Sequence, residues 1–171
     1  MNRPVFTRHL LPLGFAVALA ASPAWAVDAG EPAPALRLAT AKGDAVALDR
    51  LRGQIVYVDF WASWCGPCRR SFPWMNEMQA KYGAQGFTVV GVNVDKKRPD
   101  AERFLAQHPA GFAIVYDDGG VTPTAWGVKG MPSSYLVDRT GQVVFVERGF
   151  TDENKAAMEE RIARLLAAGK S

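Results

Sequence analysis

Two cysteines at the end of a strongly apolar segment limit, more than any other feature, how this chain can fold. Residues 55–60 (Ile-Val-Tyr-Val-Asp-Phe) are β-branched, aromatic or otherwise apolar except for Asp59, and they predict a strand buried inside a sheet. The stretch Trp-Cys-Gly-Pro-Cys, residues 64–68, follows shortly afterwards and forms the corner into a helix. The sequence therefore predicts an α/β domain with both cysteines at the start of a helix.

The spacing of Cys65 and Cys68 favours redox chemistry. Two thiols separated by two residues can close a small disulfide ring without large backbone movement. The first turn of a helix has unpaired N–H groups and the positive end of the helix dipole, so a thiolate is favoured there over a thiol. We therefore assign Cys65, at the mouth of the helix, as the attacking thiolate. Cys68, one turn in and more buried, is the resolving thiol of a thiol–disulfide exchange through a mixed disulfide.

Two structural interpretations of the cysteine pair are weaker. A four-cysteine zinc site needs a second pair, and the sequence holds only two cysteines. A static disulfide over so short a gap closes little loop entropy and adds little stability. The sequence therefore predicts redox exchange, and it calls for no metal and no cofactor.

The N-terminus has the pattern of a secretory signal peptide. Arg3 and Arg8 precede an apolar stretch, residues 10–21, and Ser-Pro-Ala-Trp-Ala follows at residues 22–26. Twelve apolar residues are few for a membrane span, although an uncleaved anchor is the alternative. We expect cleavage after Ala26, which leaves one domain of residues 27–171. Export would place the cysteine pair in the periplasm, an oxidising compartment where disulfides persist.

The charge balance argues against a nucleic-acid partner. Residues 1–26 hold two of the 20 Lys and Arg residues and none of the 17 Asp and Glu residues, so the mature chain has 18 basic and 17 acidic residues. No basic stripe with interleaved aromatic residues is present. The expected partners are proteins, and we expect the chain itself to be a monomer.

The remaining elements complete one α/β domain. A helix to about Tyr82 and a second apolar strand, residues 87–94, give a right-handed β-α-β unit with parallel strands. Alternating residues predict a hairpin at 36–38 and 45–48. The other predictions are a short helix after residue 100, strands at 114–116, 133–137 and 142–147, and a final helix capped by Thr151 or Asp152.

From residue 55 onward the chain resembles thioredoxin-fold proteins, and most closely the exported TlpA/ResA/CcmG-type thiol–disulfide oxidoreductases. The resemblance rests on residues 58–62 and 64–68, on Pro73, on Gly-Val-Lys-Gly-Met-Pro at 127–132, and on Tyr-Leu-Val-Asp at 135–138 with Gly141. It implies a thioredoxin-like fold in which helices flank a central mixed sheet, with the N-terminal β-hairpin as an extension.

The resemblance also implies roles for residues around the cysteines. Pro132 matches a cis-proline that faces the disulfide and turns the Met131 backbone toward an extended substrate segment. Trp64, Gly66, Pro67, Gly130 and Met131 would line that substrate groove, and a Met side chain suits varied protein surfaces. Asp59 matches the buried acid of thioredoxin. A carboxyl in an apolar strand has a raised pKa and could accept the Cys68 proton, or it could be a core polar group without a kinetic role.

One position departs from the ResA-like pattern. Those proteins carry a Glu near the active site just after the strand that matches residues 92–94, whereas this chain reads Asp95-Lys96. Either Asp95 takes the role of that Glu, or Asp59 alone serves the cysteine pair.

The function expected from these features is reduction of disulfides in exported proteins, apocytochrome c among them. Gly66 and Pro67 between the cysteines resemble reducing family members, because strongly oxidising members have a histidine there. A reductase outside the cytosol needs electrons from a membrane thiol donor. The alternatives are a thiol–disulfide oxidase or isomerase, a peroxide-reducing protein of the same fold, and a copper chaperone in which Cys65, Cys68 and Met131 would bind Cu(I).

Overall fold

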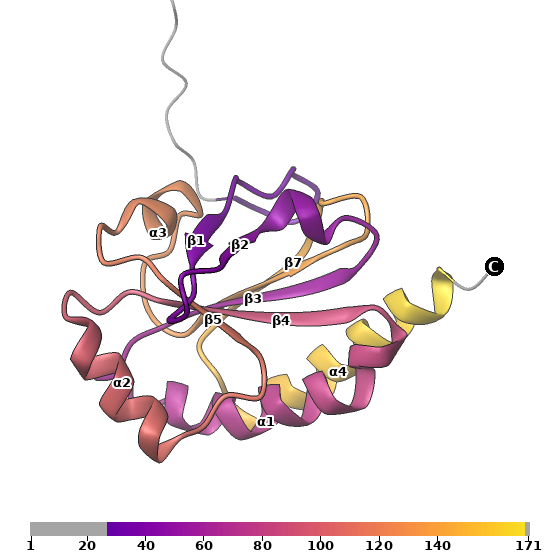
Figure 1. The fold of residues 1–171 in the computed structure, drawn as a ribbon. Helices are drawn as coiled ribbons and strands as arrows, with labels where there is room; N and C mark the ends of the chain where they lie inside the picture. The colour runs from indigo at the N-terminus through magenta and orange to yellow at the C-terminus, as the bar shows by residue number, and fades with distance from the viewer. Residues whose placement is uncertain (1–26, 170–171) are drawn as a thin grey trace, which may run out of the picture.

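A five-stranded mixed sheet forms the centre of the computed structural model, which describes residues 27–169. The strand order is β5-β4-β3-β6-β7 (Figure 1). Strands β3, β4 and β5 are parallel to one another, and β6 and β7 are antiparallel to their neighbours. The strands span Ile55–Trp61 (β3), Phe87–Asn93 (β4), Ala113–Tyr116 (β5), Ser133–Val137 (β6) and Val143–Arg148 (β7). The expected mixed sheet is confirmed.

Strand β3 lies in the middle of the sheet, and all seven of its residues are buried. It has a hydrogen-bonded neighbour on each side and a covered face above and below, which explains why its sequence is a continuous apolar run. Its side chains alternate between the two faces of the sheet. Tyr57 and Trp61 belong to the core on one face, which we call the first face and the first core. Val56, Val58 and Phe60 belong to the second core, on the opposite face.

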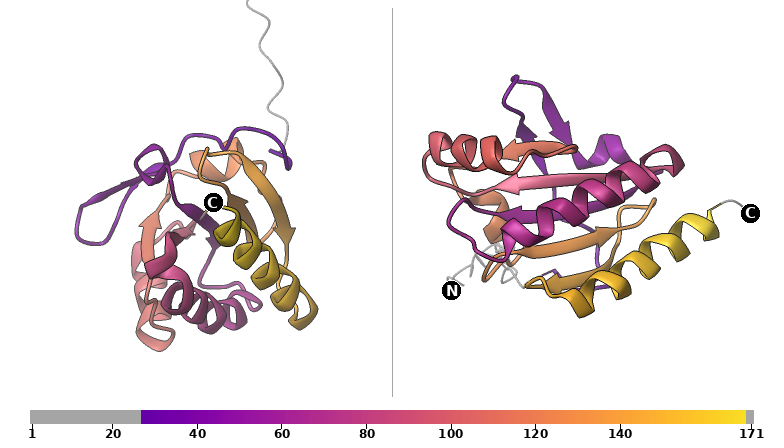
Figure 2. Two further views of the ribbon diagram at one scale, coloured as in Figure 1. Left: turned by 90° about the vertical axis from the view of Figure 1, so that its right-hand side faces the viewer. Right: turned by 90° about the horizontal axis from the view of Figure 1, so that it is seen from below.

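Three helices cover the first face of the sheet, as Figures 1 and 2 show. They are α1 (Cys68–Tyr82), α2 (Arg98–Gln107) and α4 (Asp152–Ala168). The predicted apolar face of α1 is buried, and it consists of Phe72, Met75, Met78 and Tyr82. Helix α4 begins where the sequence predicts, because the Thr151 hydroxyl accepts a hydrogen bond from the Asn154 N–H at 3.3 Å.

The N-terminal extension covers the second face together with the short helix α3 (Val121–Ala125) (Figure 1). The predicted hairpin is present as β1 (Arg37–Ala39) and β2 (Ala45–Ala47), paired antiparallel. Val27, Leu36 and Leu48 of this extension are buried in the second core. The extension is therefore an integral part of the domain, and it seals a sheet face that would otherwise meet water.

The expected signal peptide, residues 1–26, lies outside the described residues. Among residues 27–169, no helix combines the length and the hydropathy needed to cross a bilayer.

Candidate active site

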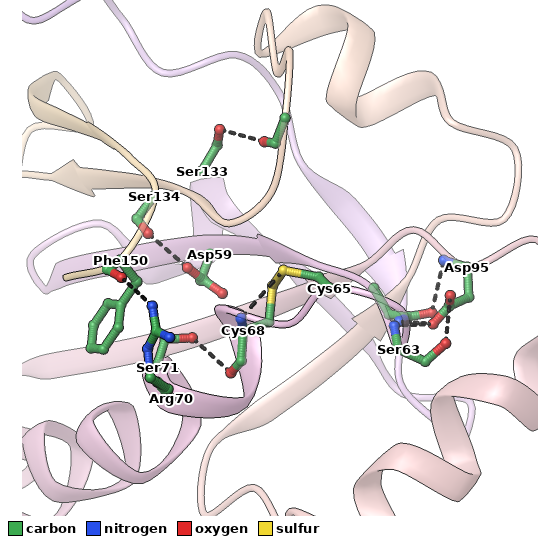
Figure 3. The surroundings of a disulfide bond; sticks show 12 residues. Asp59, Ser63, Cys65, Cys68, Arg70, Ser71, Asp95, Ser133, Ser134 and Phe150 are labelled. Carbon is green, nitrogen blue, oxygen red and sulfur yellow. Dashed lines mark hydrogen bonds between the residues drawn. A yellow bond between two sulfur atoms is a disulfide. The ribbon is translucent and has the colours of Figure 1, made fainter.

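Cys65 and Cys68 form a disulfide at the start of α1 (Figure 3), with an S–S distance of 2.06 Å and Cα atoms 5.4 Å apart. The helix begins at Cys68 and not earlier, with Pro67 as its N-cap residue, so Cys68 lies at the helix start and not one turn in as expected. Proline suits this place because it has no N–H that would need a partner. Cys68 is fully buried, and Cys65 is 3% exposed.

The geometry favours charge on Cys65. The Cys68 N–H, the first free amide of the helix, donates to Cys65 Sγ at 3.3 Å. That amide and the positive end of the α1 dipole both stabilise a negative sulfur at this position. A thiolate formed on Cys65 after reduction therefore has a donor already in place.

Asp95 braces the loop that carries Cys65. Its carboxylate accepts hydrogen bonds from the Ser63 N–H at 2.9 Å, from the Ser63 hydroxyl at 3.0 Å and from the Asn93 side-chain amide at 2.8 Å (Figure 3). Asp95 is only 4% exposed. Because the end of β4 is thereby tied to the loop after β3, the two residues before Cys65 have a defined position. Ser63 and Asn93 were not predicted as part of the site.

Asp59 is a fully buried acid on the same side of the sheet as the disulfide. The Ser134 hydroxyl donates to Asp59 Oδ1 at 2.6 Å, and Asp59 Oδ2 has no hydrogen-bond partner in the described part of the chain. Burial raises the pKa of Asp59 to about 7, and the Ser134 hydrogen bond acts in the opposite direction. Asp59 can therefore exchange a proton near neutral pH, as its apolar strand predicts.

The predicted substrate-contacting residues come from two loops. Trp64, beside Cys65, is 68% exposed, and it is one of two large apolar side chains exposed among the described residues. The Met131–Pro132 bond is cis, as the resemblance implies. Ser133 pairs with Phe60, so the register places Pro132 opposite Trp61 at the end of β3. Within residues 27–169, the N–H and C=O of Met131 have no hydrogen-bond partner.

Ser134 is the clearest contributor that sequence reasoning missed. It stands opposite Asp59 in the register of β3 and β6. Two consecutive serines in a short, otherwise apolar strand are the available signal, because buried hydroxyls need partners.

In the described part of the chain, no three His, Cys, Asp or Glu side chains come together as a metal site.

A redox-active pair at the start of α1, a buried acid behind it and a cis-proline loop beside it define a thioredoxin-fold thiol–disulfide oxidoreductase. The Redoxin family model matches residues 28–164, and the chain belongs to this family.

Proteins with similar sequences and structures carry names of the same class. The chain is 36% identical to the thiol-disulfide oxidoreductase ResA of Geobacillus thermodenitrificans over 69% of this chain and 68% of that protein. It is 28% identical to ResA of Bacillus thuringiensis subsp. konkukian over 81% and 79% of the two chains. A crystal structure from Chlorobium tepidum, assigned as a thiol:disulfide interchange protein DsbE, is 52% identical with a TM-score of 0.80. That match covers 82% of this chain and 99% of the other.

Proposed function

We propose that this protein is a reductase of disulfides in exported proteins. The observation that carries the proposal is the Cys65–Cys68 disulfide, whose Cys65 sulfur accepts the first amide of helix α1. That arrangement favours a Cys65 thiolate, which is the attacking group in exchange.

The reaction has two displacement steps in which electrons and protons balance. The Cys65 thiolate attacks the substrate disulfide, forms a mixed disulfide and releases the first substrate thiolate. Asp59 then takes the proton of Cys68, and the Cys68 thiolate attacks Cys65 Sγ. This second step closes the Cys65–Cys68 disulfide and releases the second substrate thiolate, so two electrons have passed to the substrate. A membrane thiol donor would return the pair to the reduced state.

The substrate would bind as an extended segment along the cis-proline loop. The unpaired backbone N–H and C=O of Met131 can form strand-like hydrogen bonds with such a segment. Trp64, Gly66, Pro67 and Gly130 would border the same segment and contact the substrate beside the reacting sulfur. Backbone pairing depends little on substrate side chains, which suits a reductase that serves several proteins.

The direction of electron flow is the part of the proposal that needs measurement first. Gly66 and Pro67 put no histidine between the cysteines, and this supports a reductase. Equilibration of residues 27–171 with glutathione or dithiothreitol gives the reduction potential of the pair. A value near about −270 mV or below supports the proposal, and a value near about −120 mV makes the protein an oxidant instead.

The place of action follows from the N-terminal signal-peptide pattern. We propose export to the periplasm, cleavage after Ala26 and a monomeric mature protein, with cytochrome c maturation as one pathway that needs such a reductase. Intact-mass analysis of the periplasmic fraction is expected to give a chain that starts at Val27. A chain that retains Met1 would contradict cleavage and leave the anchored form.

A further inference from the structure

The two carboxylate oxygens of Asp59 have different surroundings. Oδ1 accepts the Ser134 hydroxyl at 2.6 Å, and Oδ2 is buried without any hydrogen-bond partner among the described residues. In Figure 3 the Asp59 carboxylate lies between Ser134 and Cys68, and the oxygen that Ser134 leaves free is on the Cys68 side. A buried oxygen without a donor is costly unless the site uses it, so this asymmetry calls for an explanation.

We propose that Ser134 is a positioning residue of the exchange reaction, whose hydroxyl holds Asp59 Oδ1 so that Oδ2 is left to take the proton of Cys68. The inference rests on the role of Asp59 proposed above and adds the group that directs it. Among the described residues, the Ser134 hydroxyl is the group that donates a hydrogen bond to the Asp59 carboxylate. This bond also favours the ionised form of Asp59, which is the form that acts as the base.

The other groups around Asp59 cannot supply this effect. On β3 itself, the nearest titratable group is the buried Tyr57, whose pKa is raised by burial and by the Asp59 charge. On β4, the residue opposite Asp59 is Gly91, which has no side chain. On β7, Glu147 pairs with Ser134 and acts on Tyr57.

Helix α1 adds no cation that replaces Ser134. It supplies Cys68, the thiol itself, and Arg70, whose guanidinium instead donates to the Phe150 carbonyl oxygen at 3.3 Å. In the disulfide form, burial raises the pKa of Asp59 and the Ser134 hydrogen bond lowers it.

The test is the pH dependence of the resolving step. Reduced protein is mixed with increasing glutathione disulfide, and the rate constant at saturation, followed by tryptophan fluorescence, reports the attack of Cys68 on the mixed disulfide. We expect Ser134→Ala to move the midpoint of this profile upward by about one pH unit, because a hydrogen bond to a charged group is lost. The rate below the midpoint should then fall about tenfold, while the plateau at high pH stays near that of the wild type.

Two variants separate the hydroxyl from general disturbance of strand β6. Ser134→Thr keeps a hydroxyl and should keep the wild-type midpoint. Ser133→Ala removes the neighbouring buried hydroxyl, which donates to the Gly130 carbonyl oxygen at 2.7 Å and not to Asp59. Whatever its effect on the rate, Ser133→Ala should leave the midpoint in place. The Asp59 pKa, followed by ¹³C NMR of its carboxyl in the reduced proteins, provides a second readout.

Asp59→Asn distinguishes the failure of this inference from the failure of the proposed base. If Asp59→Asn abolishes the titration and Ser134→Ala shifts it, the inference stands. If Asp59→Asn abolishes the titration and Ser134→Ala leaves the midpoint unmoved, the role of Ser134 is overturned alone. If Asp59→Asn retains the wild-type profile, Asp59 is not the base and both assignments are wrong.

Discussion

At the scale of single residues, the burial that lets Asp59 exchange a proton near neutral pH also lowers the stability of the folded protein when the carboxyl is charged. Its pKa is about 7 in the folded protein against an ordinary value of 3.8, because burial disfavours the charge. The folded state therefore binds this proton more tightly than the unfolded state does. Stability from the protonated carboxyl is fully present below about pH 4 and is lost as the pH rises through about 7.

Asp59→Asn should accordingly stabilise the oxidised protein in a pH-dependent way. The gain in unfolding free energy is expected to be small near pH 4, to grow as the pH rises toward 7 and to level off above it, with an upper limit of about 4 kcal/mol from the pKa difference. Urea unfolding at several pH values measures it. Asp118→Asn, at an exposed position, is the matched control and should change little at any pH. A gain that does not vary with pH would contradict the assigned pKa.

The two cysteines are expected to differ sharply when each is replaced by serine. Cys68→Ser keeps the Cys65 nucleophile and loses the resolving thiol, so a mixed disulfide with substrate should accumulate. Cys65→Ser leaves only the fully buried Cys68, which should form no such adduct. Mass spectrometry after incubation with a disulfide-containing protein distinguishes the two. Adducts of Cys65→Ser alone would reverse the assigned roles.

At the scale of elements, the Asp95 brace joins the end of β4 to the loop before Cys65. Its carboxylate accepts three hydrogen bonds from Ser63 and Asn93, so it is occupied by a structural task. The sequence leaves two alternatives, in which either Asp95 also serves as a base or Asp59 alone does. The hydrogen bonds favour a structural role, because three of the roughly four acceptor positions of the carboxylate are in use.

Asp95→Asn should therefore lower stability and leave the pH midpoint of the resolving step unchanged. Loss of charge-assisted hydrogen bonds in a buried site is expected to reduce the unfolding free energy by roughly 2–3 kcal/mol. Urea unfolding and the saturating exchange rate between pH 5 and 9 measure the two effects. Ser63→Ala, which removes one of the hydrogen bonds, should give a smaller loss of the same kind. A midpoint that moves in Asp95→Asn would make Asp95 part of the proton pathway.

The elements themselves were predictable because their signals are local. Continuous apolar runs identified β3 and β4, and Thr151 identified the start of α4 within a residue. The contacts that tune the site were not predictable in the same way. Ser134 meets Asp59 across 75 positions of sequence, and only the antiparallel register of β3 and β6 brings them together. A shift of one residue in that register would turn the hydroxyl to the other face.

At the scale of the whole molecule, the sheet separates the cysteine pair, in the first core, from the second core on its opposite face. The disulfide shares the first core with helices α1, α2 and α4, and the N-terminal extension shares the second core with the opposite face of β3. Leu36 belongs to that extension and is 3% exposed. The extension should therefore influence stability without tuning the cysteine pair.

Leu36→Ala tests this separation. Truncation of a buried leucine is expected to lower the unfolding free energy by about 2–4 kcal/mol, while the reduction potential and the pH midpoint of exchange stay at wild-type values. Arg37→Ala, at the exposed neighbouring position, is the control for the hairpin and should change stability by less than about 0.5 kcal/mol. If Leu36→Ala shifts the potential at a temperature where it is fully folded, the two faces of the sheet are coupled. The N-terminal extension would then belong to the redox machinery, although it covers the opposite face of the sheet from the disulfide.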